Sequence, residues 1–323
     1  MFKRNYPKQN KLKRLILKIL KVYAIERETF EFINPKNNNY KAKNYYKFNE
    51  KSLILSNGFL DFNRKIKKLD IFYRYSPEVA LWNSSGNWKR IIPNINKETL
   101  IKVSLTSLKK TIESFLKVNR LDICLNLIYD KSSDQFNNQL LDIFSDNNFR
   151  VNIIKSKING NRGTYLECCD QAENSEDLIF FIEDDYLFKR EAIDEILFTY
   201  LRISTQTNKE LFITPTDYTF YYDKNYSTSI FIGKNYRWRI VKEMLLTFLF
   251  SRDLLSIHRD KIRAVGEIEN DPFEKPLHKI FETELCVAPI YSLSYHMSRA
   301  VPSIESDWLK VWEENYDEIN GGP

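Results

Sequence analysis

The sequence predicts an α/β protein in which helices flank a mostly parallel sheet, with a basic extension at the N-terminus. Three observations support this fold class. From Leu69 onward, short apolar runs typical of strands alternate with segments of helical periodicity. Most of these runs are apolar at successive positions, as in strands that are covered on both faces. The chain has 323 residues, of which 43% are hydrophobic, so it can bury a large core.

The elements of the first half follow in order along the chain. Strands are predicted at 69–76, 122–130, 149–156, 178–188 and 211–217. Helices are predicted at 97–118, 136–147, 165–172 and 189–204. Because strands that alternate with helices are joined by right-handed crossovers, we expect the sheet to be mostly parallel. The residues that follow its strands should then meet at one edge, where ligands of such sheets bind.

The last third of the chain has a less regular pattern. We predict a helix within 240–255, a helix from Asp271 to Phe281 and an extended segment at 285–296. Asp307, Trp308 and Trp312 are expected to belong to a terminal helix that packs on the core.

Charge divides the chain into a basic extension and an acidic body. Residues 1–70 contain 18 Lys/Arg and 6 Asp/Glu, a formal charge of +12, and the total of +6 leaves −6 for the remainder. We therefore expect a partly helical extension at 1–68, followed by two halves of the body at 69–190 and 191–323. Residues 12–23 predict a basic amphipathic helix that either lies on an anionic membrane surface or packs on the body. Its four basic residues make it too charged to span a bilayer.

Composition excludes several classes of protein. Neither GxGxxG nor GxxxxGK[ST] occurs among the eight glycines, so the Rossmann dinucleotide fingerprint and the P-loop are absent. The four cysteines form no CxxC pair, which disfavours a disulfide framework or a zinc knuckle and fits a cytoplasmic protein. With three histidines, a site built from several imidazoles is disfavoured, although one can serve as a single metal ligand.

Glu183, Asp184 and Asp185 are the strongest chemical signal in the sequence. They follow the apolar run 178–182 directly, and the chain is apolar again at 186–188. Adjacent anions at the rim of a buried strand repel one another unless a cation or solvent compensates them. A divalent ion with oxygen ligands would do so and would in turn bind a diphosphate. The alternative is an acidic turn in which Asp184 or Asp185 caps the next helix.

Residues 69–190 resemble the family 2-type glycosyltransferases of the GT-A fold. The similarity rests on an opening strand (DIFYRYS), a helix holding SLTSLKKTI, a strand that ends in an acidic loop (LIYDKSSD) and a third strand. A turn containing Gly160, Asn161 and Arg162 then precedes a helix, and FFIEDDYLF stands where that family has its DXD-like motif. The triplet departs from the family pattern because it begins with Glu. Residues 1–68 fall outside the resemblance, and 191–323 are only loosely similar.

The resemblance implies a Rossmann-like GT-A domain that moves a sugar from a nucleotide-sugar donor to a glycan, lipid or protein acceptor, with Mn²⁺ or Mg²⁺ as cofactor. Carried over by position, the nucleotide-binding residues would be Arg74, Tyr75, Asp130, Arg162 and Asp184, of which Asp184 would meet either the ribose or the metal. The metal ligands would be Glu183, Asp185 and His296, because some GT-A enzymes supply a histidine from the last third of the chain. Imidazole with carboxylate and phosphate oxygens suits Mn²⁺ and accommodates Mg²⁺.

Transfer to an acceptor hydroxyl needs a base, and a single carboxylate base implies inversion by analogy with the family. Our candidate is Asp271, which should begin a helix in the acceptor half. Its structural alternative is an N-cap, since Asp before Pro is typical of a helix start. Asp217, Asp253 and Glu269 are further candidates. Residues 236–239 (YRWR) would either offer an aromatic and cationic surface to the acceptor or begin an amphipathic helix.

Two other functions compete with sugar transfer. A nucleotidyltransferase also binds Mg²⁺ through carboxylates beside a sheet, but it usually carries a glycine-rich loop after the first strand, where this chain has RYSPEVALW. A protein that binds nucleic acid or another anionic surface would use the basic extension, where Tyr40, Tyr45 and Tyr46 lie among lysines. Because the body is acidic and carries the triplet, we expect no nucleic-acid partner.

Overall fold

The computed structural model describes residues 52–55, 58–62, 64–78, 91–92, 94–223, 228–298, 302–305 and 307–321. The chain divides into two compact units, Met1–Phe62 and Asn63–Pro323. In the first unit, β1 (Ser52–Leu55) pairs antiparallel with β2 (Gly58–Asp61). The predicted helix at 12–23 lies outside the described residues. Among those that are described, no helix is both long enough and apolar enough to cross a membrane.

The second unit begins six residues before the boundary that we expected at 68. Arg64 accounts for this difference because its guanidinium pairs with Asp177 and Glu210. The backbone N–H of Lys67 also donates to Asp177, at 2.6 Å. Residues 64–67 are therefore fastened to the body, and the halves 69–190 and 191–323 belong to one unit.

A nine-stranded sheet in the order β5-β4-β3-β6-β11-β8-β12-β10-β9 forms the centre of the second unit. Its first four strands pair in parallel and repeat the 3-2-1-4 order of doubly wound folds. They are β3 (Lys68–Tyr75), β4 (Asp122–Tyr129), β5 (Arg150–Lys155) and β6 (Leu178–Glu183). In the described residues, seven strands of this sheet share one direction, and β10 and β11 oppose them. The predicted mostly parallel α/β fold is confirmed.

The remaining strands of this sheet come from the last third of the chain. They are β8 (Leu211–Ile213), β9 (Ile230–Ile232), β10 (Arg237–Ile240), β11 (Phe248–Ser251) and β12 (Leu285–Ile290). The prediction of a helix at 240–255 was wrong up to Ser251, because β11 occupies its middle, and only its last four residues are helical, as the start of α7 (Arg252–Glu267). Phe248 pairs with Phe181, and Leu249 pairs with both Phe180 and Ile213, so β11 is buried between β6 and β8. A short run that is apolar at every position fits such a strand as well as a helix.

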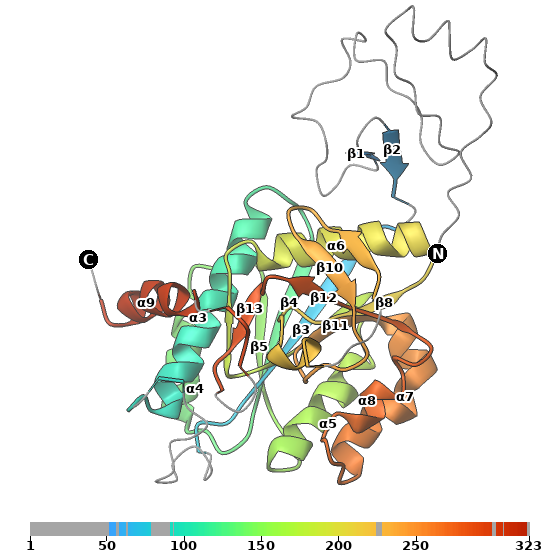
Figure 1. Cartoon of the computed structure of the whole chain (residues 1–323). Helices are drawn as coiled ribbons and strands as arrows, with labels where there is room; N and C mark the ends of the chain where they lie inside the picture. Colours follow the sequence, from blue (N-terminus) through green and yellow to red (C-terminus); the bar gives the residue numbers. More distant parts are fainter. Residues whose placement is uncertain are drawn as a thin grey trace, which may run out of the picture. The chain divides into compact units, whose positions relative to one another are not determined.

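Helices cover both faces of the sheet (Figure 1). On one face lie α3 (Lys97–Leu116), α4 (Asp134–Asp142) and α6 (Ala192–Thr207). On the other lie α5 (Asn161–Ala172), α7 (Arg252–Glu267) and α8 (Lys275–His278). Neighbouring residues of β3 show the alternation: the hydroxyl of Tyr73 bonds Ser104 of α3, whereas Arg74 points to Asn161 of α5.

The acidic strand end is positioned by hydroxyl groups along α3. The predicted strand at 178–188 is broken after Glu183, and Tyr186–Phe188 forms a separate strand, β7. Ser104 donates to the carbonyl of Tyr186 at 2.7 Å, and Ser107 accepts from the N–H of Phe188 at 3.0 Å. One turn further on, Thr111 accepts from the N–H of Ile193. This helical spacing of hydroxyls satisfies backbone groups that would otherwise be buried without partners.

A buried carboxylate in α6 organises the β9–β10 hairpin. Glu195 is fully buried and accepts hydrogen bonds from the backbone N–H groups of residues 234–236, the indole of Trp238 and the hydroxyl of Thr199. Gly233 is required beside it, because a Cβ atom there would lie 2.2 Å from Oε1 of Glu195. Residues 237–239 of the motif at 236–239 thus belong to a strand, and neither of the two interpretations of its sequence included a strand.

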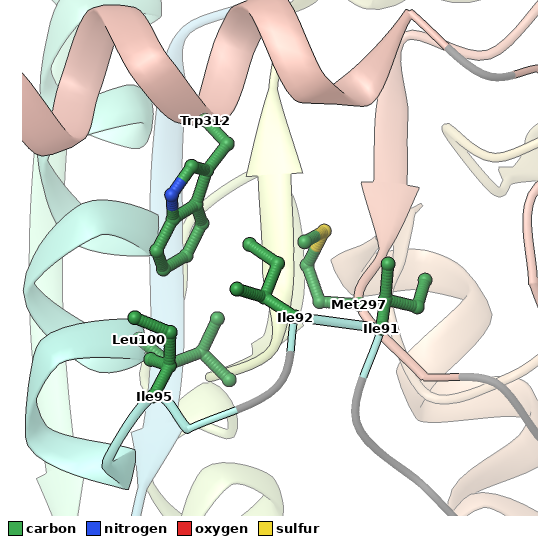
Figure 2. A pocket seen from close by; sticks show the side chains of 6 residues that line it. All are labelled: Ile91, Ile92, Ile95, Leu100, Met297 and Trp312. Atoms are coloured by element: carbon green, nitrogen blue, oxygen red, sulfur yellow. The ribbon is translucent and has the colours of Figure 1, made fainter.

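The C-terminal helix packs as predicted. Helix α9 (Trp308–Ile319) follows Asp307, and Trp312 is 5% exposed. Trp312 lines an apolar pocket with Leu100 of α3 and Met297, together with Ile91, Ile92 and Ile95 (Figure 2). Because Met297 follows His296 and Leu100 lies one helical turn after Lys97, this apolar cluster supports two residues of the site described next.

Candidate functional site

The carboxyl ends of β3, β4 and β6 bring three predicted site residues together. Arg74 lies opposite Glu183 in the parallel register of β3 and β6, and Asp130 follows the last residue of β4. The turn before α5 links them, because Arg74 bonds Asn161 and Asp130 accepts from the N–H of Gly160 at 2.6 Å. Gly160 has φ +90, a conformation that residues with a side chain rarely adopt.

Two of the three adjacent carboxylates pair with buried cations. Glu183 forms an ion pair with Arg74, and the Nζ atom of Lys97 lies 2.6 Å from Oδ1 of Asp184. The second oxygen of Asp184 accepts the N–H of Ser76 at 3.0 Å. Burial raises the pKa of both carboxyl groups, whereas Arg74 and Lys97 oppose that shift. Protein cations therefore compensate part of the charge that the sequence led us to assign to a metal.

The third carboxylate, Asp185, faces His296. Nε2 of His296 lies 3.3 Å from Oδ2 of Asp185, because β13 (Ser294–His296) pairs antiparallel with β7. The imidazole stacks on Tyr186 at a ring distance of 4.8 Å, and Tyr186 shares a 2.6 Å hydrogen bond with Tyr218. Burial would raise the pKa of Asp185, but His296 and Lys97 outweigh it and hold this pKa below its usual range. The predicted proximity of His296 and the triplet is confirmed.

Asp185 and His296 fit a divalent ion as two of its ligands. Oδ1 of Asp185 is buried and has no hydrogen-bond partner. An unpartnered carboxylate oxygen beside an imidazole suits Mn²⁺ or Mg²⁺, which commonly complete their coordination with phosphate oxygens and water. Glu183, which we expected as a ligand, is turned to Arg74. Within the described ranges, no three His, Cys, Asp or Glu side chains are grouped as a complete metal site.

Of the other residues expected at the nucleotide, Asp130 has an atom available. Its Oδ1 is buried without a partner and can accept an N–H group of a base. Tyr75 is 2% exposed and donates its hydroxyl to Asn137 of α4 at 2.8 Å, because it points to the opposite face from Arg74. Arg162 donates to the backbone carbonyls of Gly266 and Glu267 at the end of α7. The structure thus corrects the expectation for these two: Tyr75 and Arg162 serve helix packing.

Glu274 is a site residue that the sequence reasoning missed. It precedes the first residue of α8, and burial, followed by the charge of Glu183, raises the pKa of its carboxyl group to about 7. Arg74 and His296 lower this pKa in part, so Glu274 is electrostatically coupled to both sides of the site. Pro276 in the first turn of α8 was the available signal, since an acidic residue before such a proline also marks a helix start.

The carboxylates proposed as bases lie elsewhere. Asp271 is exposed, and α8 begins at Lys275 rather than next to Asp271. Asp253 and Glu269 are exposed as well. Asp217 is 1% exposed and pairs with Arg239, while the hydroxyl of Tyr222 donates to its second oxygen at 2.7 Å. Asp271 was therefore a poor choice, because it is exposed, whereas the carboxyl group of Glu274 is partly buried and is electrostatically linked to Glu183.

No family model and no curated protein matches the sequence. Several solved structures are similar to it. TarS residues 1–349 from S. aureus, in complex with UDP, has a TM-score of 0.44 and 12% identity over 71% of this chain and 60% of that chain. The 4-diphosphocytidyl-2C-methyl-D-erythritol synthase of Anaerococcus prevotii has a TM-score of 0.39 and 10% identity over 79% and 96% of the two chains. UDP-glucose pyrophosphorylase of Acinetobacter baumanii has a TM-score of 0.41 and 10% identity over 79% and 93%.

These similarities concern the fold. TarS is a glycosyltransferase and the pyrophosphorylase is a nucleotidyltransferase. This chain spans about 60% of the length of the TarS fragment. Identities of 10–12% and TM-scores below 0.5 do not separate the two reactions. The site itself must carry any statement about function, and its residues belong to an α/β domain with the strand order of nucleotide-binding folds.

Proposed function

We propose that this protein is a glycosyltransferase that moves a sugar from a nucleoside-diphosphate sugar to an acceptor hydroxyl. One observation carries the proposal: Asp185, with an unpartnered buried oxygen, lies 3.3 Å from His296, and His296 interacts electrostatically with the carboxyl group of Glu274, whose pKa is raised to about 7. The first two residues suit a metal-bound diphosphate, and the third suits a base that works near neutral pH. A site of this kind can activate an acceptor and stabilise a leaving diphosphate.

The donor would bind across the ends of β3, β4 and β6. Asp130 would accept an N–H group of the base, and Asp184 would lie near the ribose. Asp185 and His296 would hold Mn²⁺ or Mg²⁺, which when bound neutralises the charge that develops on the leaving diphosphate. Arg74 fixes Glu183 and the turn before α5, so it would position the nucleotide pocket and not contact the sugar.

Glu274 would act as the base of a single displacement. Its carboxylate takes the proton of the acceptor hydroxyl while the acceptor oxygen forms a bond to the anomeric carbon. The bond from that carbon to the diphosphate breaks, and the nucleoside diphosphate leaves with the electron pair. Attack from the side opposite to the leaving group inverts the anomeric centre. The acceptor is a glycan, lipid or protein, and membrane contact through residues 12–23 on the cytoplasmic face remains part of the proposal.

The test is donor-dependent stabilisation followed by product analysis. UDP-, GDP-, TDP- and CMP-sugars are titrated with and without Mn²⁺, and the melting temperature is recorded. We expect one donor to raise it in the presence of Mn²⁺ and the shift to vanish in Asp185→Asn. Release of nucleoside diphosphate from that donor, slow without an acceptor, should be lost in Glu274→Gln. Absence of a response to the UDP-, GDP- and TDP-sugars would contradict the proposal, and so would a response to the CMP-sugar alone, because that donor carries a single phosphate.

A nucleotidyltransferase would give a different product. Incubation of the stabilising donor with pyrophosphate would then yield a nucleoside triphosphate and a sugar 1-phosphate. The site offers no specific reason to prefer this reaction, because a sugar phosphate attacks as an anion and needs no base such as Glu274. Formation of the triphosphate at a rate above diphosphate release would replace our proposal by this one.

A further inference from the structure

Lys97 occupies a position that helix electrostatics disfavours. It is the first residue of α3, directly after the N-cap Asn96, where the helix dipole opposes a positive charge. Its side chain is only 7% exposed, and its Nζ atom lies 2.6 Å from Asp184. Burial lowers the pKa of Lys97, but Asp184 and Asp185 outweigh it, so the ammonium group is charged. The acidic strand end, and not the helix, explains this lysine.

The ion pair between Lys97 and Asp184 removes Asp184 from metal binding. Both carboxylate oxygens of Asp184 are occupied, one by Lys97 and the other by the N–H of Ser76. Side-chain exposures of 7% and 13% show that water screens this pair little. The ammonium group thus takes the place beside Asp184 that a divalent ion would otherwise occupy.

The formal charges at the strand end nearly cancel. Glu183, Asp184 and Asp185 contribute −3, and Arg74 and Lys97 contribute +2, which leaves −1 before His296 is counted. The affinity of an oxygen-ligand site for a divalent ion rises with the number of charged ligands. A balance of −1 is weak for a metal alone, whereas a diphosphate would add both negative charge and oxygen ligands.

We propose that Lys97 makes metal binding conditional on the diphosphate, so that the metal enters this site only as a metal–diphosphate complex. This inference rests on the proposed function for the identity of the diphosphate, which would belong to the nucleotide-sugar donor. Lys97 is a positioning residue in this scheme, because it acts on Asp184 and not on the reacting atoms. A merely structural role for Lys97 would predict lower stability in its absence but no change in metal affinity.

The test measures Mn²⁺ binding by electron paramagnetic resonance in the absence of any nucleotide. The full-length wild type should bind Mn²⁺ weakly, and Lys97→Met should bind at least tenfold more tightly, because Asp184 is released and the charge becomes −2. The matched control is the double variant Lys97→Met/Asp184→Asn, which removes one charge of each sign and restores −1. It should bind Mn²⁺ as weakly as the wild type.

Two results would overturn the inference. One is Lys97→Met binding Mn²⁺ no more tightly than the wild type, and the other is an equal gain in the double variant, which would indicate general loosening. Should Lys97→Met fail to fold, refolding it with Mn²⁺ decides the matter: recovery of folded protein supports the inference, and no recovery contradicts it. Lys97→Arg keeps the charge and should behave as the wild type does.

A separate arm uses inorganic pyrophosphate as the probe for the diphosphate. Wild-type protein should bind the Mn²⁺–pyrophosphate complex at least tenfold more tightly than Mn²⁺ alone, and Lys97→Met should show a smaller ratio. An equal ratio in the two proteins would contradict conditional binding. The donor titration described above depends on recognition of a nucleotide, and the pyrophosphate experiment does not. Failure of the proposed function can therefore be distinguished from failure of this inference.

Discussion

At the scale of single residues, the three adjacent carboxylates have three different environments. Arg74 neutralises Glu183, Lys97 neutralises Asp184, and Asp185 lies 3.3 Å from His296 while one of its oxygens has no partner. Chemically identical groups thus acquire different roles from the element that lies opposite each one. The charges of the site follow from this arrangement, and two of our predictions concern residues beside it.

The first prediction concerns Glu274 and pH. Since its pKa is about 7, the carboxylate form increases as the pH rises through 7, and the transfer rate should rise with it and then level off. Glu274→Gln should lower kcat by about 100- to 10,000-fold and leave donor affinity unchanged. The control is Asp271→Asn, which should retain wild-type kcat. Equal losses in both variants, measured by initial rates from pH 5.5 to 9, would refute the assignment.

Although Glu274→Gln should lower kcat, the same substitution should raise the stability of the folded protein. A raised pKa means that the folded state holds this proton more tightly than the unfolded chain does. The resulting stabilisation is complete below about pH 4.5 and is lost as the pH rises through about 7. Glutamine stays neutral, so Glu274→Gln should exceed the wild type in free energy of unfolding by on the order of 2 kcal/mol at pH 8. Urea denaturation at pH 5 and pH 8 measures this difference.

The second prediction concerns Asp130. Asparagine would keep one oxygen on the N–H of Gly160 and present an NH₂ group to the base, where an acceptor is needed. Asp130→Asn should therefore weaken donor binding about 10- to 100-fold, as expected for a hydrogen bond to a charged group. Tyr75→Phe is the control, because the Tyr75 hydroxyl bonds Asn137. Calorimetric titration with the stabilising donor gives both affinities, and weaker binding by Tyr75→Phe alone would reverse this interpretation.

Sequence reasoning correctly placed the site residues whose positions follow from the ends of the strands alone. Arg74, Asp130 and the triplet meet because parallel strands end at one edge. Tyr75 was misplaced because adjacent residues of a strand face opposite sides, and the side that faces the nucleotide cannot be read from an isolated run. Glu274 was missed because its pKa depends on burial and on Glu183, which is distant in sequence.

At the scale of elements, the first half of the body was predictable and the second half was not. Strands and helices from Lys68 to Glu183 are local in sequence, and each has a clear periodicity. Apart from the β9–β10 hairpin, the strands β8 to β12 pair across long intervals, and β11 is a four-residue strand with three apolar residues inside an otherwise amphipathic pattern. Its identity as a strand comes from its two neighbours in the sheet, which no window of sequence contains.

The third prediction concerns the β9–β10 hairpin, which a single buried carboxylate of α6 supports. Glu195→Ala would leave the N–H groups of residues 234–236 and the indole of Trp238 without their acceptor. We expect a loss of about 3–5 kcal/mol in the free energy of unfolding. Asp194→Asn, in the same helix, should cost less than about 1 kcal/mol, because Asp194 pairs with one partly exposed lysine. Similar losses in both, measured by urea denaturation, would contradict the proposed support.

At the scale of the whole molecule, residues 63–323 have the contacts needed to fold alone. Arg64 and Lys67 fasten the start of this unit to Asp177, and its sheet and helices enclose one core. The fourth prediction is that a chain of residues 63–323 keeps its free energy of unfolding within about 1 kcal/mol of that of the full chain. It should also keep the donor-induced shift in melting temperature.

Flotation with anionic liposomes tests whether residues 1–62, which this truncation removes, bind a membrane surface. The full chain should float with the vesicles and the truncated chain should not, because residues 1–62, with 14 Lys/Arg and 5 Asp/Glu (a formal charge of +9) and the segment 12–23, are absent from it. Equal flotation of both proteins would exclude membrane contact through this segment. Loss of the donor-induced shift would show that the nucleotide site depends on residues before Asn63.

The antiparallel strand between β6 and β8 has a mechanical consequence. Because β11 pairs with β6 on one side and with β8 on the other, the first four strands and the strands β8, β12, β10 and β9 belong to one continuous sheet. These two groups of strands cannot move apart without breaking the pairing of β11 with one of its neighbours. The amide protons of Phe248 to Phe250 should therefore exchange with solvent only when the entire domain unfolds.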